Sequence, residues 1–193
     1  MDNRLIVAGF GGQGVMMIGQ LLCYTAVEHG KEALFLPHYG PEQRGGTANC
    51  SVILSEEPIG SPIARQIQSL IVMNMPSLVK FQGRVKPGGT IFINSNLVSP
   101  EEVRKDVTCL AIAVDELAAG LGSPKVANII MLGAYVQKSG FFTEEEILKT
   151  VCAKLAKKPQ LLEMNKAALK LGMEKAKAYQ ADDLSFQCAA DVT

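Results

Sequence analysis

Residues 4–15 read RLIVAGFGGQGV, and this stretch decides the fold class. Its first part, residues 4–9, is a run of apolar residues that predicts a buried strand. Residues 10–14 form a glycine-rich turn, and residues 15–29 predict a helix that ends near Gly30. A second apolar run, residues 33–36, stops at Pro37. Strand, helix and strand in this order predict a parallel pair joined by a right-handed crossover.

The rest of the chain continues as an α/β pattern. Residues 47–54 alternate between apolar and polar, which predicts a half-buried strand, and the turn at residues 55–58 predicts a hairpin. Further strands are expected at residues 70–73, 90–94 and 107–114, with a turn at residues 86–89. Helices are expected at residues 126–138 and 160–179. Another helix is expected to begin at the capping box formed by Thr143 and Glu146.

These elements predict a three-layer, Rossmann-like α/β fold with a mainly parallel sheet. A β-hairpin insertion follows the second strand, and the C-terminal end is helical. We expect one domain over residues 1–181 and a polar C-terminal tail over residues 182–193.

The composition limits the possible functions. The 193 residues are 48% hydrophobic and 20% charged, which indicates a globular chain with a sizeable core. Lys and Arg together number 19, as do Asp and Glu, so the excess positive charge of a nucleic-acid-binding protein is missing. No apolar run reaches the roughly 18 residues of a membrane span, and no signal peptide is recognisable, so a cytoplasmic location is expected. The five cysteines have the spacing of neither a zinc site nor an iron–sulfur site, and we predict no metal site.

The first glycine loop fits the pattern G-x-G-x-x-G between a strand and a helix. Such a loop allows a tight turn and leaves the N–H groups of the helix N-terminus free for an anion. A dinucleotide fold also places an acidic residue at the end of the second strand, but residues 36–38 read LPH. Three interpretations therefore stay open: a dinucleotide site, a packing role alone, or a site for an anionic or polar ligand or a partner segment. The candidate residues are Gly9, Gly11, Gly12, Gln13 and Gly14.

The second loop, residues 38–46, reads HYGPEQRGG. It follows the second strand and should lie beside the first loop at the carboxyl edge of the sheet, where open α/β folds bind ligands. Arg44 could hold a phosphate or carboxylate through two parallel hydrogen bonds. The alternative is an interface loop whose Glu42 and Arg44 form ion pairs with a neighbouring chain. The candidate residues are Tyr39, Gly40, Pro41, Glu42, Gln43, Arg44, Gly45 and Gly46.

With both loops in this order, the sequence resembles the gamma subunit of 2-oxoacid:ferredoxin (acceptor) oxidoreductases. The second loop is most similar to those of the 2-oxoglutarate and branched-chain enzymes. The resemblance covers roughly residues 4–172. Later landmarks are residues 86–90, Asn94 with Ser95, Asn128 with residues 132–134, and residues 165–167 with Gly172.

The resemblance implies a non-autonomous subunit of an enzyme that converts a 2-oxoacid and coenzyme A into acyl-CoA and CO₂, with ferredoxin reduced. Thiamine diphosphate, Mg²⁺ and iron–sulfur clusters are then expected on alpha, beta or ferredoxin-like delta subunits, and this chain alone is expected to hold no cofactor. Asn94 joins the candidate ligand or interface residues, and no catalytic residue is assigned.

Two alternatives stay open: a stand-alone NAD- or FAD-binding oxidoreductase, and a non-catalytic scaffold module of the same fold. The helices at residues 15–29 and 126–138 are more apolar than a lone domain needs. We therefore predict a large protein–protein interface, for which a homodimer of the isolated chain is one form.

Overall fold

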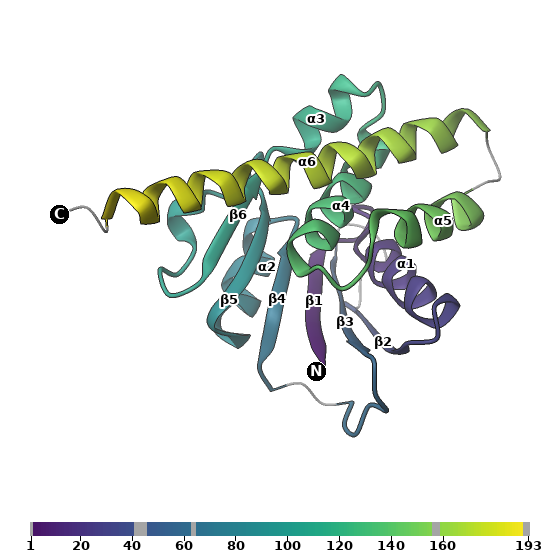
Figure 1. The fold of residues 1–193 in the computed structure, drawn as a ribbon, viewed down its shortest axis with the longest axis horizontal. Coiled ribbons are helices and arrows are strands. Elements are labelled where there is room, and N and C mark those ends of the chain that lie inside the picture. Colours follow the sequence, from purple (N-terminus) through teal and green to yellow (C-terminus); the bar gives the residue numbers. More distant parts are fainter. Residues whose placement is uncertain (1, 41–45, 63–64, 156–158, 191–193) are drawn as a thin grey trace.

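Six strands form one mixed sheet in the order β2-β3-β1-β4-β5-β6 (Figure 1). The computed structural model describes residues 2–40, 46–62, 65–155 and 159–190, with side chains in these ranges except 159–160 and 180–190. The strands are β1 (Asn3–Phe10), β2 (Glu32–Tyr39), β3 (Thr47–Ser55), β4 (Ile67–Val72), β5 (Val85–Asn94) and β6 (Thr108–Ile112). The neighbouring pairs β1–β4, β4–β5 and β5–β6 are parallel, whereas β3 is antiparallel to both β1 and β2.

Helices cover both faces of this sheet. They are α1 (Val15–Glu28), α2 (Met75–Phe81), α3 (Val114–Gly120), α4 (Ala127–Ser139), α5 (Glu144–Leu155) and α6 (Pro159–Ala190). Side chains alternate along a strand, so Leu5 and Val7 of β1 pack towards α1 and α4, while Ile6 and Ala8 join the cluster that contains Leu78 of α2. The predicted three-layer α/β fold with a mainly parallel sheet is confirmed.

The long helix α6 crosses α4 with their backbones in close contact (Figure 1). A Cβ atom added to Gly133 would overlap the carbonyl oxygen of Leu169, and one added to Gly172 would overlap that of Ile130. Each helix thus contributes a glycine against the backbone of the other. Close packing of the two helices therefore explains Gly133 and Gly172, which belong to the later landmarks of the sequence.

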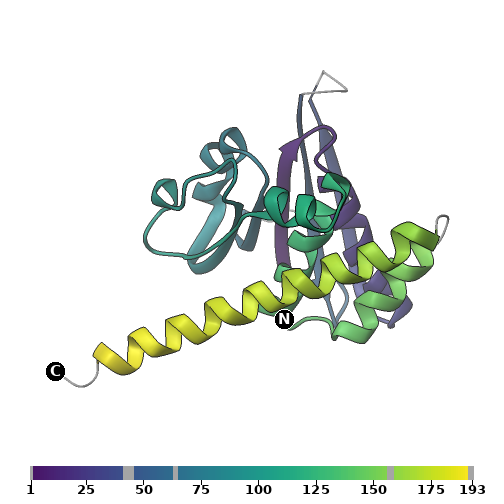
Figure 2. The same cartoon turned by 90° about the horizontal axis from the view of Figure 1, so that it is seen from above.

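Helix α4 is buried on nearly every face because it lies between the sheet and α6. All of its residues from Ala127 to Val136 are buried within this chain. The apolar character of this helix was one reason to predict a protein–protein interface. Its apolar side chains are instead buried within the chain itself. The final helix also extends further than predicted, to Ala190 rather than residue 179, and Figure 2 shows it projecting from the body of the domain.

The predicted pairing of the first two strands is wrong. Strand β3 lies between β1 and β2 and pairs antiparallel with both, so β1 and β2 run in the same direction but do not touch. The hairpin after the second strand exists, but it joins β2 to β3 through the second loop instead of turning at residues 55–58. The predicted turn at residues 86–89 lies within β5, where Gly88 has a φ of 74° and the pairing with β4 shifts register.

No helix in the described ranges is both long enough and apolar enough to cross a lipid bilayer.

Candidate functional site

The glycine loop bends sharply between β1 and α1. Gly12 and Gly14 have φ values of 102° and 74°, in the left-handed region that side chains disfavour. A Cβ atom on Gly14 would overlap the side chain of Asn128, and one on Gly9 would lie 2.7 Å from Oε1 of Gln13. Three of the predicted glycines are therefore required by the geometry of the loop itself.

The two predicted loops meet at the carboxyl end of β1. The N–H of Gly11 donates to the carbonyl oxygen of Gly46 at 3.0 Å, and the N–H of Gly40 donates to that of Thr47 at 2.8 Å. The loops adjoin because β3 starts between the ends of β1 and β2. Five of the predicted site residues, Pro41, Glu42, Gln43, Arg44 and Gly45, lie outside the described residues.

A cleft of about 380 Å³ opens between these loops, and we call it the loop cleft. It is lined by the glycine loop, the first turn of α1 and the ends of β2 and β3. Met16, Met17, Gln20 and Tyr39 contribute side chains to its wall, and Tyr39 is 70% exposed. The wall is therefore mainly apolar, with a phenol at its rim.

The first turn of α1 brings hydrogen-bond donors to this cleft. The helical ladder begins with the N–H of Ile18 donating to Gly14 at 3.2 Å, so the N–H groups of Val15, Met16 and Met17 have no acceptor within the helix. The first turn contains no acidic side chain, and no described side chain caps it. The partial positive charge of this uncapped helix N-terminus suits an anion.

Gln13 is bound within the chain. Its Oε1 accepts from the N–H of Phe10 at 2.7 Å and from Nδ2 of Asn74 at 3.1 Å, while its Nε2 donates to the carbonyl oxygen of Met73 at 3.0 Å. Both ends of the amide are therefore occupied by the ends of β1 and β4.

A second cavity, of about 270 Å³, lies on the other side of the glycine loop, towards the start of α4. Lys125 and Asn128 line it, together with Asp115. Nδ2 of Asn128 reaches the carbonyl oxygen of Gly14 at 3.4 Å, and its side chain is almost fully buried. Asn128 thus supports the glycine loop from α4, a role that its spacing in the sequence could not have revealed.

Asn94 does not reach the loop cleft. It lies buried at the end of β5, where Nδ2 donates to Oδ2 of Asp115 at 2.8 Å and Oδ1 accepts from the N–H of Asn96 at 3.2 Å. Asn96 in turn accepts from the N–H of Asp115 at 3.0 Å. Asn94 therefore joins β5 to the start of α3, and its partner Asp115 lines the second cavity together with Gly12, Gln13 and Gly14.

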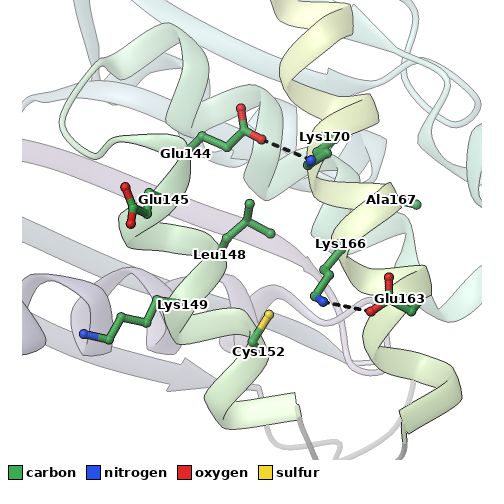
Figure 3. Close-up of a pocket in the computed structure, with 9 residues that line it drawn as sticks. All are labelled: Glu144, Glu145, Leu148, Lys149, Cys152, Glu163, Lys166, Ala167 and Lys170. Carbon is green, nitrogen blue, oxygen red and sulfur yellow. Dashed lines mark hydrogen bonds and ion pairs between the residues drawn. The ribbon is translucent and has the colours of Figure 1, made fainter.

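A wider groove, of about 790 Å³, runs between α5 and α6 (Figure 3). It shares no lining residue with the loop cleft. Lys170 pairs with Glu144 at 3.7 Å, and Lys166 pairs with Glu163 at 2.8 Å, so much of its charge is neutralised within the groove. No group of three or more His, Cys, Asp or Glu residues in the described part of the chain is arranged to hold a metal ion.

Comparison with known proteins matches residues 4–175 to the family model of pyruvate ferredoxin/flavodoxin oxidoreductase. The chain is 35% identical, over 91% of its length, to ketoisovalerate oxidoreductase subunit VorA of Methanothermobacter thermautotrophicus, but spans only 37% of that relative. It is 32% identical to 2-oxoglutarate synthase subunit KorC of Methanocaldococcus jannaschii, covering 92% of this chain and 95% of KorC.

Among solved structures, the gamma subunit of a keto/oxoacid ferredoxin oxidoreductase from Geobacter sulfurreducens superposes with a TM-score of 0.82. The two are 28% identical, and the match covers 93% of this chain and 98% of the subunit. These relatives share both the sequence and the fold over nearly the whole length of the chain. The chain therefore belongs to the pyruvate ferredoxin/flavodoxin oxidoreductase family.

Proposed function

We propose that this chain is the gamma-type subunit of a 2-oxoacid:ferredoxin oxidoreductase. In the complete reaction, a 2-oxoacid, coenzyme A and two oxidised ferredoxins give an acyl-CoA, CO₂, two reduced ferredoxins and a proton. The proposed substrate is 2-oxoglutarate or a branched-chain 2-oxoacid, because two of the relatives are named as a ketoisovalerate oxidoreductase subunit and a 2-oxoglutarate synthase subunit.

The observation that carries the proposal is the junction of the two loops through Gly11 and Gly46. It places the free N–H groups of α1 at one end of an apolar cleft. An anionic group joined to a long, partly apolar arm would match this pairing of donors and apolar wall. Coenzyme A has this chemistry, so we place its contact with this subunit at the loop cleft.

Arg44 is the proposed anion-binding side chain of the second loop. In the sequence it stands between Tyr39 and Gly46, which both line the loop cleft. Its partner is a phosphate of coenzyme A or a carboxylate of a neighbouring subunit.

We assign thiamine diphosphate, Mg²⁺ and the iron–sulfur clusters to the partner subunits. This assignment is what the resemblance to the family implies. The contribution of this chain is then to bind and orient, and the redox chemistry takes place on alpha, beta or delta subunits.

The exposed face of α1 is the proposed contact surface for those subunits. Met17, Tyr24 and Val27 are 39%, 46% and 66% exposed, and their spacing places them along one side of the helix. Tyr39 continues this apolar surface at the loop cleft. In the isolated chain the same surface could support a homodimer, and we propose a cytoplasmic location for the complex.

The test is reconstitution of the native complex with and without this chain. Acceptor reduction is measured with pyruvate, 2-oxoglutarate and 2-oxoisovalerate, each with coenzyme A. We expect turnover to need this chain and to be highest with 2-oxoglutarate or 2-oxoisovalerate. Full turnover without the chain would instead support a scaffold module, and micromolar binding of NAD or FAD to the pure chain would revive a stand-alone oxidoreductase.

Arg44→Ala tests the site in the same assay. We expect a higher KM for coenzyme A or weaker assembly of the complex, because an anion partner is lost. The matched control is Arg65→Ala. Arg65 is exposed and lies just before β4, at the end of the sheet where the parallel strands begin. Equal kinetics and assembly for the two variants would remove Arg44 from the site.

A further inference from the structure

The strand order creates a crevice between β1 and β4. The chain leaves β1 for α1 on one face of the sheet and leaves β4 for α2 on the other (Figure 1). The loops that follow these two adjacent parallel strands therefore diverge. Such a topological switch point is the usual place for a ligand in an open α/β sheet.

In this protein a side chain of the glycine loop bridges the two strand ends at that crevice, where Gln13 and Met73 also line the second cavity. The amide of Gln13 accepts from Phe10 at the end of β1, and it also accepts from Asn74 and donates to Met73 in the segment after β4. The N–H of Met73 further donates to Ala8 of β1 at 2.9 Å. The two strand ends are thus joined to each other through the amide of Gln13.

Asn74 extends this connection to α2. It is 3% exposed, and while its Nδ2 donates to Gln13, its Oδ1 caps α2 by accepting from the N–H of Ser77 at 3.0 Å. The orientation of Asn74 is therefore fixed by the helix, and Asn74 in turn fixes the position of Oε1 of Gln13. Gly9 must lack a side chain because that oxygen lies 2.7 Å from the place of its Cβ.

We propose that Gln13 is a positioning residue for the ligand of the loop cleft. By anchoring the glycine loop through three hydrogen bonds, it holds the N–H groups of the first turn of α1 in place. The ligand of the loop cleft then binds on the β3 side of the glycine loop, beside Tyr39. The identity of this ligand as coenzyme A rests on the proposed function.

The first experiment measures amide hydrogen exchange of the full chain for wild type and Gln13→Met. Methionine has a similar length and volume but forms none of the three hydrogen bonds, so the core around it stays filled. We expect the protection of the Phe10 amide to fall at least tenfold. In the control Gln66→Met, at an exposed glutamine before β4, it should stay within twofold. Unchanged protection in Gln13→Met would overturn the proposal.

The variant Asn74→Ser isolates the link to α2. Serine retains an N-cap oxygen for the helix but cannot donate to Gln13, which keeps two of its three bonds. We expect a loss of Phe10 protection smaller than that of Gln13→Met, and little further loss when the two substitutions are combined. Fully additive losses would show that the two side chains do not act together.

The second experiment measures steady-state kinetics of the reconstituted complex. For Gln13→Met we expect the KM for coenzyme A to rise at least fivefold, with kcat within twofold of wild type. A purely structural role would lower the yield or stability of the complex and leave this KM unchanged, and that result would overturn the positioning role. If the wild-type complex does not turn over, the proposed function fails while hydrogen exchange still tests the anchoring by Gln13.

Discussion

Replacing Gly172 with alanine should destabilise the protein, although alanine is the better helix former. In a helix interior the exchange gains about 1 kcal/mol. Here the new methyl group would overlap the carbonyl oxygen of Ile130 and lie 2.8 Å from the carbonyl carbon and 3.1 Å from the N of Ala134. These are backbone atoms of α4, which cannot rotate away, so α6 must shift, and its Leu169 and other buried residues then lose packing against the core.

Overpacking of this kind costs about 1–3 kcal/mol, and a collision with backbone falls at the upper end. After the gain in helix propensity, we expect a net loss of about 2 kcal/mol. With a urea m-value of about 2 kcal/mol/M, the unfolding midpoint would fall by about 1 M. Circular dichroism of the isolated chain in urea measures this shift.

Gly120→Ala is the matched control because it changes the same residue type in a helix without a collision. A Cβ atom at this position would have no described atom of another element within 4 Å, and the φ of Gly120 is outside the left-handed range. We expect a stabilisation of about 0.4–1 kcal/mol. If Gly172→Ala were as stable as Gly120→Ala, the close crossing of α4 and α6 would be refuted.

Four further outcomes follow from the surroundings of single residues. Thr143→Ala should cost about 1 kcal/mol at pH 7 in urea unfolding, because it removes half of the capping box. The hydrogen bond from the N–H of Thr143 lowers the pKa of Glu146. The stabilisation by Glu146 is therefore present above about pH 4 and lost as the pH falls through that lowered pKa. The difference in unfolding free energy between wild type and Glu146→Ala should thus be smaller at pH 3 than at pH 7. Burial raises the pKa of Cys23 and Cys50 to about 12. At pH 8 iodoacetamide should therefore label both thiols roughly a thousandfold more slowly than in the unfolded chain. Peptide mass spectrometry measures this labelling. Tyr135→Phe should lower the free energy of unfolding by about 1 kcal/mol, because the buried hydroxyl donates to Oδ1 of Asn3 in β1 at 3.1 Å. An unchanged urea midpoint would exclude that bond.

The sequence predicted the elements of the fold better than their arrangement. Periodicity located the strands and helices, and Thr143 with Glu146 marked the start of α5 correctly. The order of strands did not follow, because residues 47–54 pair with β1 and β2 at once. A local pattern shows that a strand is half-buried but does not show which neighbours bury it.

The site was predicted in outline for a partly mistaken reason. The two loops were expected to meet because β1 and β2 were expected to pair, whereas they meet because β3 starts between them at Thr47. Asn94 was grouped with them by its place in the family pattern, but its contacts lie at the start of α3. The supporting roles of Asn74 and Asn128 depend on contacts across more than sixty residues of sequence, which no local pattern contains.

The inserted strand changes the geometry that a dinucleotide site would need beside the G-x-G-x-x-G loop. With β3 in between, the end of β2 lies two strand spacings, or about 10 Å, from the end of β1. An acidic residue there would be displaced from the ribose position, and the sequence has Pro37 and His38 instead. Gln13 bridges the ends of β1 and β4 beside the second cavity, and the first turn of α1 lines the loop cleft on the other side of the glycine loop. Such a cleft can bind part of a ligand whose remainder lies on another chain, as a subunit of a larger enzyme requires.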